Sequence, residues 1–249
     1  MSFLLHKPRV PPKQLVFAIG DIHGCLKHLE YLQQKILAYA ANYPSYQKTV
    51  IYLGDYIDRG PAAKGVIDNL LGNSLPGFDT IFIKGNHEQM LLDFIETAGL
   101  GQVWFDYTNG GRETIHSYDV TEPRFFTDLD QTQKQFIAAF PDAHLQFMRG
   151  LKMNHIIGDY YFVHAGVHPG KPLDQQLNED MLWIREPFLS SHNDYGKIIV
   201  HGHTIVAHAD IKNNRIAVDT GAFWSGVLTA LALHDDKREF LQTAKAVKQ

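Results

Sequence analysis

Residues 50–60 read Val-Ile-Tyr-Leu-Gly-Asp-Tyr-Ile-Asp-Arg-Gly, a short apolar run followed at once by a glycine-bounded turn with three charged side chains. A continuous apolar run that ends at turn residues is typical of a buried strand. Comparable runs, each followed by a polar side chain able to bind a metal, occupy residues 15–19, 80–83, 161–163, 198–200 and 216–218. A further run, 228–233, follows Gly226. These patterns predict seven buried strands.

Helical patterns separate the first three of these runs. Apolar residues recur at helical spacing over 26–40, and shorter patterns of the same kind cover 62–71 and 88–98. Alternating strands and helices predict a layered α/β fold, in which ligands gather beyond the carboxyl ends of the strands. The polar residues that follow such ends include Asp21, Asp55, Asn86, His164 and His203.

The segment between Asn86 and His164 interrupts this alternation. Helical patterns cover 131–140 and 143–151, with Pro141 ending the first of them. Because no repeat, linker or change of composition divides the chain, we expect one domain over residues 1–249 with a mostly helical insertion at about 99–157. The charged tail, 235–249, is expected to be helical.

Composition excludes several classes of protein. The 249 residues are 45% apolar and 20% charged, as in an ordinary globular protein. The 23 Lys and Arg against 27 Asp and Glu give a net charge of −4, which argues against a nucleic-acid partner but allows a phosphate substrate at a local metal or arginine site. One cysteine, Cys25, excludes a disulfide framework. No apolar run approaches the roughly 18 residues of a membrane span. We therefore expect no membrane partner and a cytoplasmic location.

Three glycine-bounded motifs carry the metal-binding chemistry. They are Gly20-Asp21-Ile22-His23-Gly24, Gly54-Asp55-Tyr56-Ile57-Asp58-Arg59-Gly60 and Gly85-Asn86-His87-Glu88. Asp and neutral His are good ligands for divalent metals, and an i, i+2 pair on a turn can converge on one ion. A single Gly-Asp turn is common. Three such motifs after predicted strands, spaced 34 and 31 residues apart, indicate a shared metal site.

Together these motifs resemble those of the calcineurin-like metallophosphoesterases. They are most similar to the bacterial serine/threonine phosphoprotein phosphatases, and so are Phe162-Val163-His164-Ala165-Gly166 and His201-Gly202-His203-Thr204. Diesterase branches usually read Gly-His-x-His, whereas this chain has Ile205 at the last position, which favours the phosphatase branch. The resemblance spans about residues 15–233. It implies a four-layer αββα sandwich with a dinuclear metal centre.

The resemblance also implies six metal ligands. Asp21 and His23 would bind the first metal, Asp55 would bridge both, and Asn86, His164 and His203 would complete the second. His201 would lie nearby without binding. The charges of two divalent ions, two carboxylates and a bridging hydroxide sum to about +1. This positive net charge favours binding of a phosphoryl group. Manganese is the expected metal among divalent or trivalent ions, and iron or zinc also suits the mixed nitrogen and oxygen ligands.

Four further residues receive roles from the same resemblance. His87 would be the general acid that protonates the leaving oxygen, with Asp58 holding and charging its imidazole. Arg59 would bind phosphate oxygens. Arg185 would do the same, with a structural ion pair as the alternative.

Two enzyme hypotheses share this site. The first is a metal-dependent phosphoric monoester hydrolase, a serine/threonine protein phosphatase in which a bridging hydroxide attacks phosphorus in line. The second is a symmetrical dinucleoside-tetraphosphate hydrolase, for which Trp104, Phe105 and Tyr107 would stack on bases unless they belong to the core. A non-catalytic phosphate- or metal-binding module would be expected to have lost ligands, and none is missing. The substrate would be a phosphorylated protein or a small phosphoester, and the oligomeric state is left open.

Overall fold

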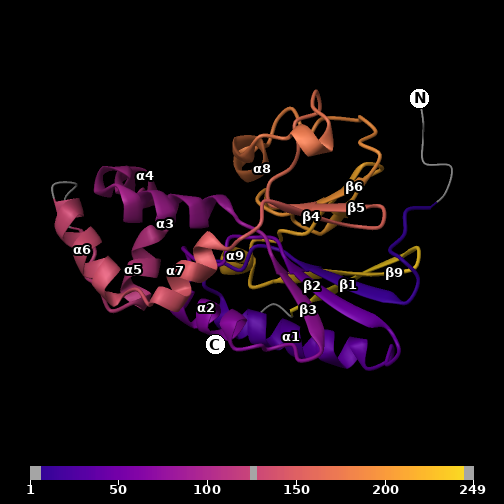
Figure 1. Cartoon of the computed structure of the whole chain (residues 1–249), viewed down its shortest axis with the longest axis horizontal. Helices are drawn as coiled ribbons and strands as arrows, with labels where there is room; N and C mark the ends of the chain where they lie inside the picture. Colours follow the sequence, from indigo (N-terminus) through magenta and orange to yellow (C-terminus); the bar gives the residue numbers. More distant parts are fainter. Residues whose placement is uncertain (1–6, 124–127, 244–249) are drawn as a thin grey trace.

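The computed structural model describes residues 7–123 and 128–243, which form two five-stranded sheets with helices outside them (Figure 1). The first sheet, in the order β10-β9-β1-β2-β3, consists of β1 (Gln14–Ile19), β2 (Gln47–Tyr52), β3 (Phe78–Phe82), β9 (Thr229–His234) and β10 (Lys237–Gln242). β1, β2 and β3 run parallel, and β9 pairs with β1 antiparallel. The three parallel strands therefore present their carboxyl ends at one edge of the sheet.

The second sheet repeats this arrangement. In the order β4-β5-β6-β8-β7, it consists of β4 (Asn154–Ile157), β5 (Tyr160–Val163), β6 (Ile198–His201), β7 (Asp210–Ile211) and β8 (Arg215–Ala217). β5, β6 and β8 run parallel, and the outer strands β4 and β7 are antiparallel to their neighbours. A second set of three carboxyl ends results.

Alternation along β1 divides its apolar residues between two cores. Val16 and Ala18 pack between the two sheets, together with Val200 of β6. Leu15 and Phe17 point to the opposite face and pack in the core that contains the helices. Because successive side chains of a strand point to opposite faces, a strand covered on both sides must be apolar throughout. This requirement explains the continuous apolar runs of β1, β5 and β6. The run at 80–83 was also expected to be buried, but it lies largely in β3, an edge strand whose residues are half-buried or exposed.

Helices and loops cover the two outer faces. α1 (Leu26–Ala40) and α2 (Ala63–Leu71) lie on the first sheet, and Leu29 and Ile36 of α1 share a core with Phe17. The second sheet is covered by η3 (Leu173–Gln175), α8 (Asn178–Trp183) and loops, from which Met181 and Phe188 pack near Tyr161. The expected α/β fold with two sheets between helical layers is confirmed. Its fourth layer is thin, because loops take the place of long helices.

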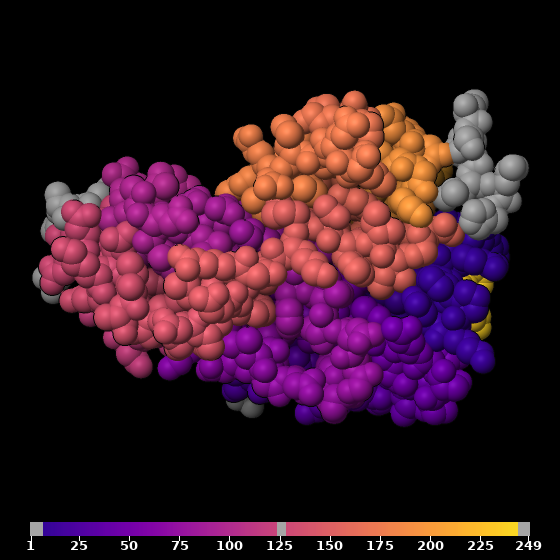
Figure 2. Space-filling view, viewed as in Figure 1, coloured from indigo at the N-terminus to yellow at the C-terminus, as the bar shows by residue number. Residues whose placement is uncertain are grey.

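Helices also occupy most of the chain between the two sheets. η1 (Ala98–Leu100), α4 (Gly101–Trp104), α5 (Gly111–Ser117), α6 (Leu129–Ala139) and α7 (Asp142–Arg149) lie with α3 (Asn86–Glu96) at one end of the molecule. Trp104, Phe105 and Phe136 pack on Phe94 of α3 to form an aromatic core. These helices end earlier than expected, because β4 already belongs to the second sheet. In the space-filling view, the upper outline is hollowed between this helical segment and the region of α8 (Figure 2).

The end of the chain departs from expectation. Of the run 228–233, residues 229–233 lie in a strand, β9, as predicted. The charged residues after it were expected to be helical, but 237–242 instead form β10 in a hairpin with β9. Charged side chains suit an exposed edge strand as well as a helix, so the pattern did not separate the two. Residues 244–249 lie outside the described residues. No helix in the described part of the chain has the length and apolar character to cross a membrane.

Candidate functional site

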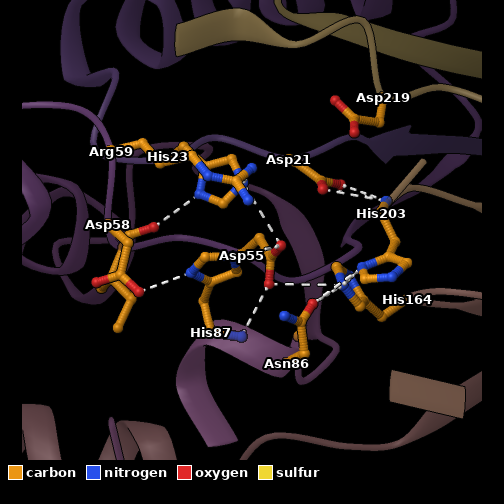
Figure 3. A network of polar contacts seen from close by, with 12 residues as sticks. Asp21, His23, Asp55, Asp58, Arg59, Asn86, His87, His164, His203 and Asp219 are labelled. Atoms are coloured by element: carbon orange, nitrogen blue, oxygen red, sulfur yellow. Dashed lines mark hydrogen bonds and ion pairs between the residues drawn. The ribbon is translucent and has the colours of Figure 1, made fainter. Parts of the chain in front are cut away.

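The predicted site residues meet where the carboxyl ends of the two sets of parallel strands come together (Figure 3). Loops after β1, β2 and β3 in the first sheet and after β5, β6 and β8 in the second supply the side chains. In chain order these are Asp21, His23, Asp55, Asp58, Arg59, Asn86, His87, His164, His203 and Asp219. All except Arg59 are buried.

One cluster of ligand atoms joins the two sheets. Nε2 of His164 and Nδ1 of His203 lie 2.9 and 3.0 Å from Oδ1 of Asn86, and the two nitrogens are 3.2 Å apart. Oδ1 of Asp55 lies 3.5 Å from Nε2 of His164. Nδ1 of His164 donates to the carbonyl of Leu53 at 2.8 Å, so Nε2 of the neutral ring carries a lone pair. The lone pair of His164 Nε2, the amide oxygen of Asn86 and the Asp55 carboxylate therefore converge beside His203, an arrangement that suits a cation.

A second cluster surrounds the other carboxylate oxygen of Asp55. Nε2 of His23 lies 3.5 Å from Oδ2 of Asp55, and Nε2 of His87 lies 3.8 Å from the same oxygen. Nδ1 of His23 donates to a backbone carbonyl at 2.9 Å, so its Nε2 also carries a lone pair. Two groups of residues thus each bring their ligand atoms within 4.8 Å of one another. The first is His23, Asp55 and His87, and the second is Asp55, His164 and His203. Asp55 is shared by both.

Three buried carboxylates lie in this space. The backbone N–H of His203 donates to both oxygens of Asp21, at 3.0 and 3.1 Å, and Asp219 accepts the N–H of Gly221 at 2.8 Å. Burial, followed by the charges of Asp219 and Asp55, raises the pKa of Asp21 well above its usual range. Burial also raises the pKa of Asp219 to about 6. A bound cation would favour the ionised forms of these acids.

The remaining ligand candidates have the charge state that metals require. Burial lowers the pKa values of His23 and His164, and it lowers the pKa of His203 to about 2. For Asp55, burial opposes ionisation, but the surrounding imidazoles, with His164 contributing most, hold its pKa below its usual range. Neutral imidazole nitrogens and a carboxylate are the donors that divalent metals take in proteins. The residues present therefore fit a pair of metal ions.

His87 differs from the other imidazoles of the site. Its Nδ1 lies 2.6 Å from Oδ2 of Asp58. Burial opposes its protonation, but the Asp55 carboxylate and the hydrogen bond to Asp58 outweigh burial and raise the pKa of His87. Asp58 is held by the helical segment, because Nε1 of Trp104 donates to Oδ2 at 2.9 Å and the hydroxyl of Thr114 donates to Oδ1 at 2.6 Å. The geometry thus favours a protonated ring whose Nε2 faces Asp55.

The two predicted phosphate-binding arginines border the cluster. Nη1 of Arg59 donates to Nε2 of His23 at 2.8 Å, so it occupies the lone pair that a metal would take. Nη1 of Arg185 donates to the hydroxyl of Thr204 at 2.8 Å and to the carbonyl of His203 at 3.2 Å. Within residues 7–123 and 128–243, Arg185 forms no ion pair with an acidic side chain. The alternative role for Arg185, a structural ion pair, is therefore not found among these residues.

The backbone at these loops adopts an unusual conformation. His23, Asp55, Asp58, Arg59 and His203 have φ values between 45° and 70°, the left-handed region. Each such residue costs about 1–3 kcal/mol when it carries a side chain. Backbone conformations of this kind are concentrated at functional sites, because the surrounding structure must hold a side chain in one direction.

Glu88 connects two of the loops, a role that was not predicted from the sequence. Its carboxylate accepts the backbone N–H groups of Asp55, Tyr56 and Gly85 at 2.8–2.9 Å. These donors favour the ionised form, whereas burial raises the pKa of Glu88 to about 8. A Cβ at Gly85 would lie 2.1 Å from Oδ1 of Asp55, so only glycine allows this approach.

Other residues of the site also received no role from the sequence. Asp219 follows a predicted strand, as the expected ligands do, and that pattern could have identified it. Thr114 gives no such signal, because its contact with Asp58 spans 56 residues of chain. His201 is buried beside the site, as expected, and its Nε2 has no hydrogen-bond partner among the described residues. Burial lowers the pKa of His201 to about 4.

Comparison with known proteins places the chain in a family. A sequence profile of the calcineurin-like phosphoesterases matches residues 15–222, most of the chain. The chain belongs to this family, as the resemblance of its motifs implied, and it is a metallophosphoesterase, a hydrolase of phosphoric esters.

The names of similar proteins describe different activities. The serine/threonine-protein phosphatase 2 of Salmonella typhimurium is 30% identical, over 86% of this chain and 90% of its own length. The asymmetrical bis(5'-nucleosyl)-tetraphosphatase PrpE of Anoxybacillus flavithermus is 27% identical, over 86% of this chain and 88% of its own. A crystal structure of a candidate diadenosine tetraphosphatase superposes with a TM-score of 0.65 at 20% identity, covering 97% of this chain and all of the other. At that identity the superposition shows the fold alone.

Proposed function

We propose that this protein hydrolyses phosphoric monoesters on phosphorylated serine and threonine side chains. The observation that carries the proposal is the pair of ligand clusters sharing Asp55, with the His87–Asp58 pair directly beside them. Hydrolysis of an alkyl phosphate needs positive charge that binds the phosphate and a proton for the leaving alkoxide oxygen. This arrangement offers both within one buried site.

The ligand assignment combines the two clusters with the resemblance of the motifs, because Asp21 belongs to neither cluster. Asp21 and His23 would hold the first metal, Asp55 would lie between the two, and Asn86, His164 and His203 would hold the second. Manganese is the proposed metal, and iron or zinc suits the same donors. When bound, the two ions supply Lewis acidity and an activated water. His87 lies almost as near Asp55 as His23 does, but it is assigned as an acid and not as a ligand, because the resemblance implies that role and its Nδ1 is held by the Asp58 carboxylate.

The chain's own residues then divide the work on the substrate. Arg59 and Arg185 would turn their guanidinium donors to the phosphate oxygens and fix the phosphorus in line for attack. For His23 to hold the first metal, its Nε2 would have to be free of the hydrogen bond from Arg59. His87 would donate its Nε2 proton to the departing serine or threonine oxygen, and the Asp58 carboxylate would stabilise the imidazolium before transfer.

Two of the aromatic residues suggested for a nucleotide hydrolase do not support that alternative. Trp104 and Phe105 are buried in the aromatic core of the helical segment, and the indole of Trp104 donates to Asp58. Neither is available to stack on a base. Tyr107, at 90% exposure, lies on the surface. The name of the Salmonella relative agrees with a protein phosphatase, and the symmetrical dinucleoside-tetraphosphate hydrolase remains the competing proposal.

A substrate panel tests the proposal. The manganese-loaded enzyme should release phosphate from phosphoserine and phosphothreonine peptides and from p-nitrophenyl phosphate. Diadenosine tetraphosphate should be a poor substrate. Fast cleavage of that compound to two molecules of ADP, together with inert phosphopeptides, would overturn the proposal in favour of its alternative.

A further inference from the structure

A groove with a volume of about 590 Å³ opens beside Arg59, one of the proposed phosphate-binding residues. The start of α1, the turn that follows Arg59 and the short helix α9 (Ala222–Ser225) form its walls. The residues that matter for recognition are Leu26, Lys27, His28, Arg59, Phe223 and Trp224. None of the metal ligands proposed above lines it, and of these six side chains only that of Arg59 has been given a role.

The groove is continuous with the metal site. The guanidinium of Arg59 lies over the ring of Phe223, 4.8 Å from its centroid. The ring of His23 meets Phe223 edge to face at 5.3 Å. Phe223 is thus in contact with a proposed metal ligand and a proposed phosphate-binding residue at once. A ligand whose phosphate lies on the metals would extend directly into the groove.

The walls of the groove are mostly apolar and unusually exposed. The indole of Trp224 is 85% exposed, and the ring of Phe223 is also exposed. Ile205, which stands where diesterase relatives have a histidine, does not line the groove; it is 49% exposed and lies near Gly221, just before α9. Exposed aromatic residues beside a catalytic site are typical of recognition surfaces, where tryptophan contributes strongly to binding.

The charges of the groove favour an anionic ligand. Lys27 is exposed and His28 is half-buried, and Arg59 stands at the inner end. Among the described residues, no acidic side chain lines the groove. In the part of the chain that the structure describes, neither Lys27 nor His28 forms an ion pair with a carboxylate. An acidic group entering the groove would therefore meet unpaired positive charge.

We propose that this groove binds the peptide segment next to the phosphorylated residue, with a large apolar or aromatic side chain against Phe223 and Trp224 and an acidic side chain toward Lys27. The inference rests on the proposed phosphoprotein phosphatase activity and names the sequence that it prefers. A nucleotide base could also stack on Phe223 and Trp224, but the described lining offers no carboxylate or amide side chain to hydrogen-bond the edges of the base, so the peptide is the favoured occupant.

Phosphoserine peptides test the proposal. Phenylalanine is moved singly through the three positions on each side of phosphoserine in an otherwise alanine peptide, and then aspartate is moved in the same way. The manganese-loaded enzyme should prefer phenylalanine at one position by about tenfold in kcat/KM, mainly through KM. Trp224→Ala should abolish that preference. Lys27→Glu should reverse the preference for aspartate into one for lysine at the same position.

Matched controls separate these effects from general damage. Tyr107→Ala removes another exposed aromatic ring, and Lys134→Glu reverses another exposed charge, both in the helical segment and outside the groove. Both should retain the full peptide preferences. The affinity of the same peptides carrying a non-hydrolysable phosphonate, measured by fluorescence anisotropy, should change in parallel with KM.

The outcomes distinguish the groove from the activity. If the plain alanine phosphopeptide is hydrolysed but Trp224→Ala and Lys27→Glu leave the position preferences intact, the groove proposal is overturned and the phosphatase stands. If no phosphopeptide or p-nitrophenyl phosphate is hydrolysed, the proposed function fails. A loss in Trp224→Ala confined to ATP or diadenosine tetraphosphate would identify the occupant as a nucleotide and would also overturn the proposal.

Discussion

Replacing Asp58 with asparagine removes the charge that faces His87 and leaves the shape of the side chain almost unchanged. Oδ2 of Asp58 accepts from His87 and Trp104, so the amide oxygen of the substituted side chain is expected at that position. Its NH₂ group would then face the hydroxyl of Thr114, which can rotate to accept. The variant should therefore fold, and His87 should keep its orientation.

The size of the effect follows from the hydrogen bond that loses its charge. A hydrogen bond to a charged group contributes about 1.5–3 kcal/mol, and a neutral one contributes about 0.5–1.5 kcal/mol. The difference, about 1–1.5 kcal/mol, corresponds to about one unit in the pKa of His87. Asp58 raises this pKa, and the proton donor exists below it. The fall of kcat on the alkaline side should therefore begin about one pH unit lower in Asp58→Asn, with a loss of about tenfold above that point.

Profiles of kcat against pH on two esters check this reasoning. The loss should be large for a phosphoserine peptide, whose alkoxide leaves with difficulty, and small for p-nitrophenyl phosphate, whose phenolate needs little help. His87→Asn should lower kcat on the peptide by roughly 10²–10⁴ with both metals retained by elemental analysis. An unchanged alkaline limb in Asp58→Asn, equal losses on both esters, or loss of metal from His87→Asn would refute the assignment of His87 as the acid.

Three further results are expected. Chelation should abolish activity and manganese should restore it. Asp55→Asn should be the most damaging ligand change, because both clusters share Asp55. Full turnover by enzyme shown to be metal-free would contradict the assignment of a metal site. Arg59→Ala and Arg185→Ala should each weaken inhibition by vanadate by about 1.5–3 kcal/mol at unchanged metal content, and wild-type inhibition of Arg185→Ala would mean that the second phosphate donor lies elsewhere. Trp104→Phe should lower kcat on phosphoserine peptides more than on p-nitrophenyl phosphate and reduce the free energy of unfolding by about 1.5–3 kcal/mol, measured in urea, through the lost hydrogen bond to Asp58; equal kcat losses on both esters would assign Trp104 to packing alone.

The positions of seven of the strands along the chain, and of the polar residues after them, could be predicted from the sequence, whereas their order in the two sheets could not. A strand buried on both faces must be apolar throughout, so β1, β2, β5 and β6 are visible as continuous runs. Because parallel strands bring their carboxyl ends to one edge, the residues after those runs could be expected to meet. Asp21, Asp55, Asn86, His164 and His203 do meet there. Their assignment to individual metals stays a prediction.

Tertiary structure decided what local pattern could not express. Trp104 was open to two interpretations, and only the packing of the helical segment shows that it is buried and bonded to Asp58, 46 residues earlier in the chain. The groove at Phe223 and Trp224 likewise depends on α9 lying against the start of α1. Hydrophobic periodicity indicates which faces of a helix or strand are buried, because a buried position favours an apolar residue whatever covers it. It does not indicate which distant segment covers that face, because the tertiary packing of whole helices and strands determines the contact.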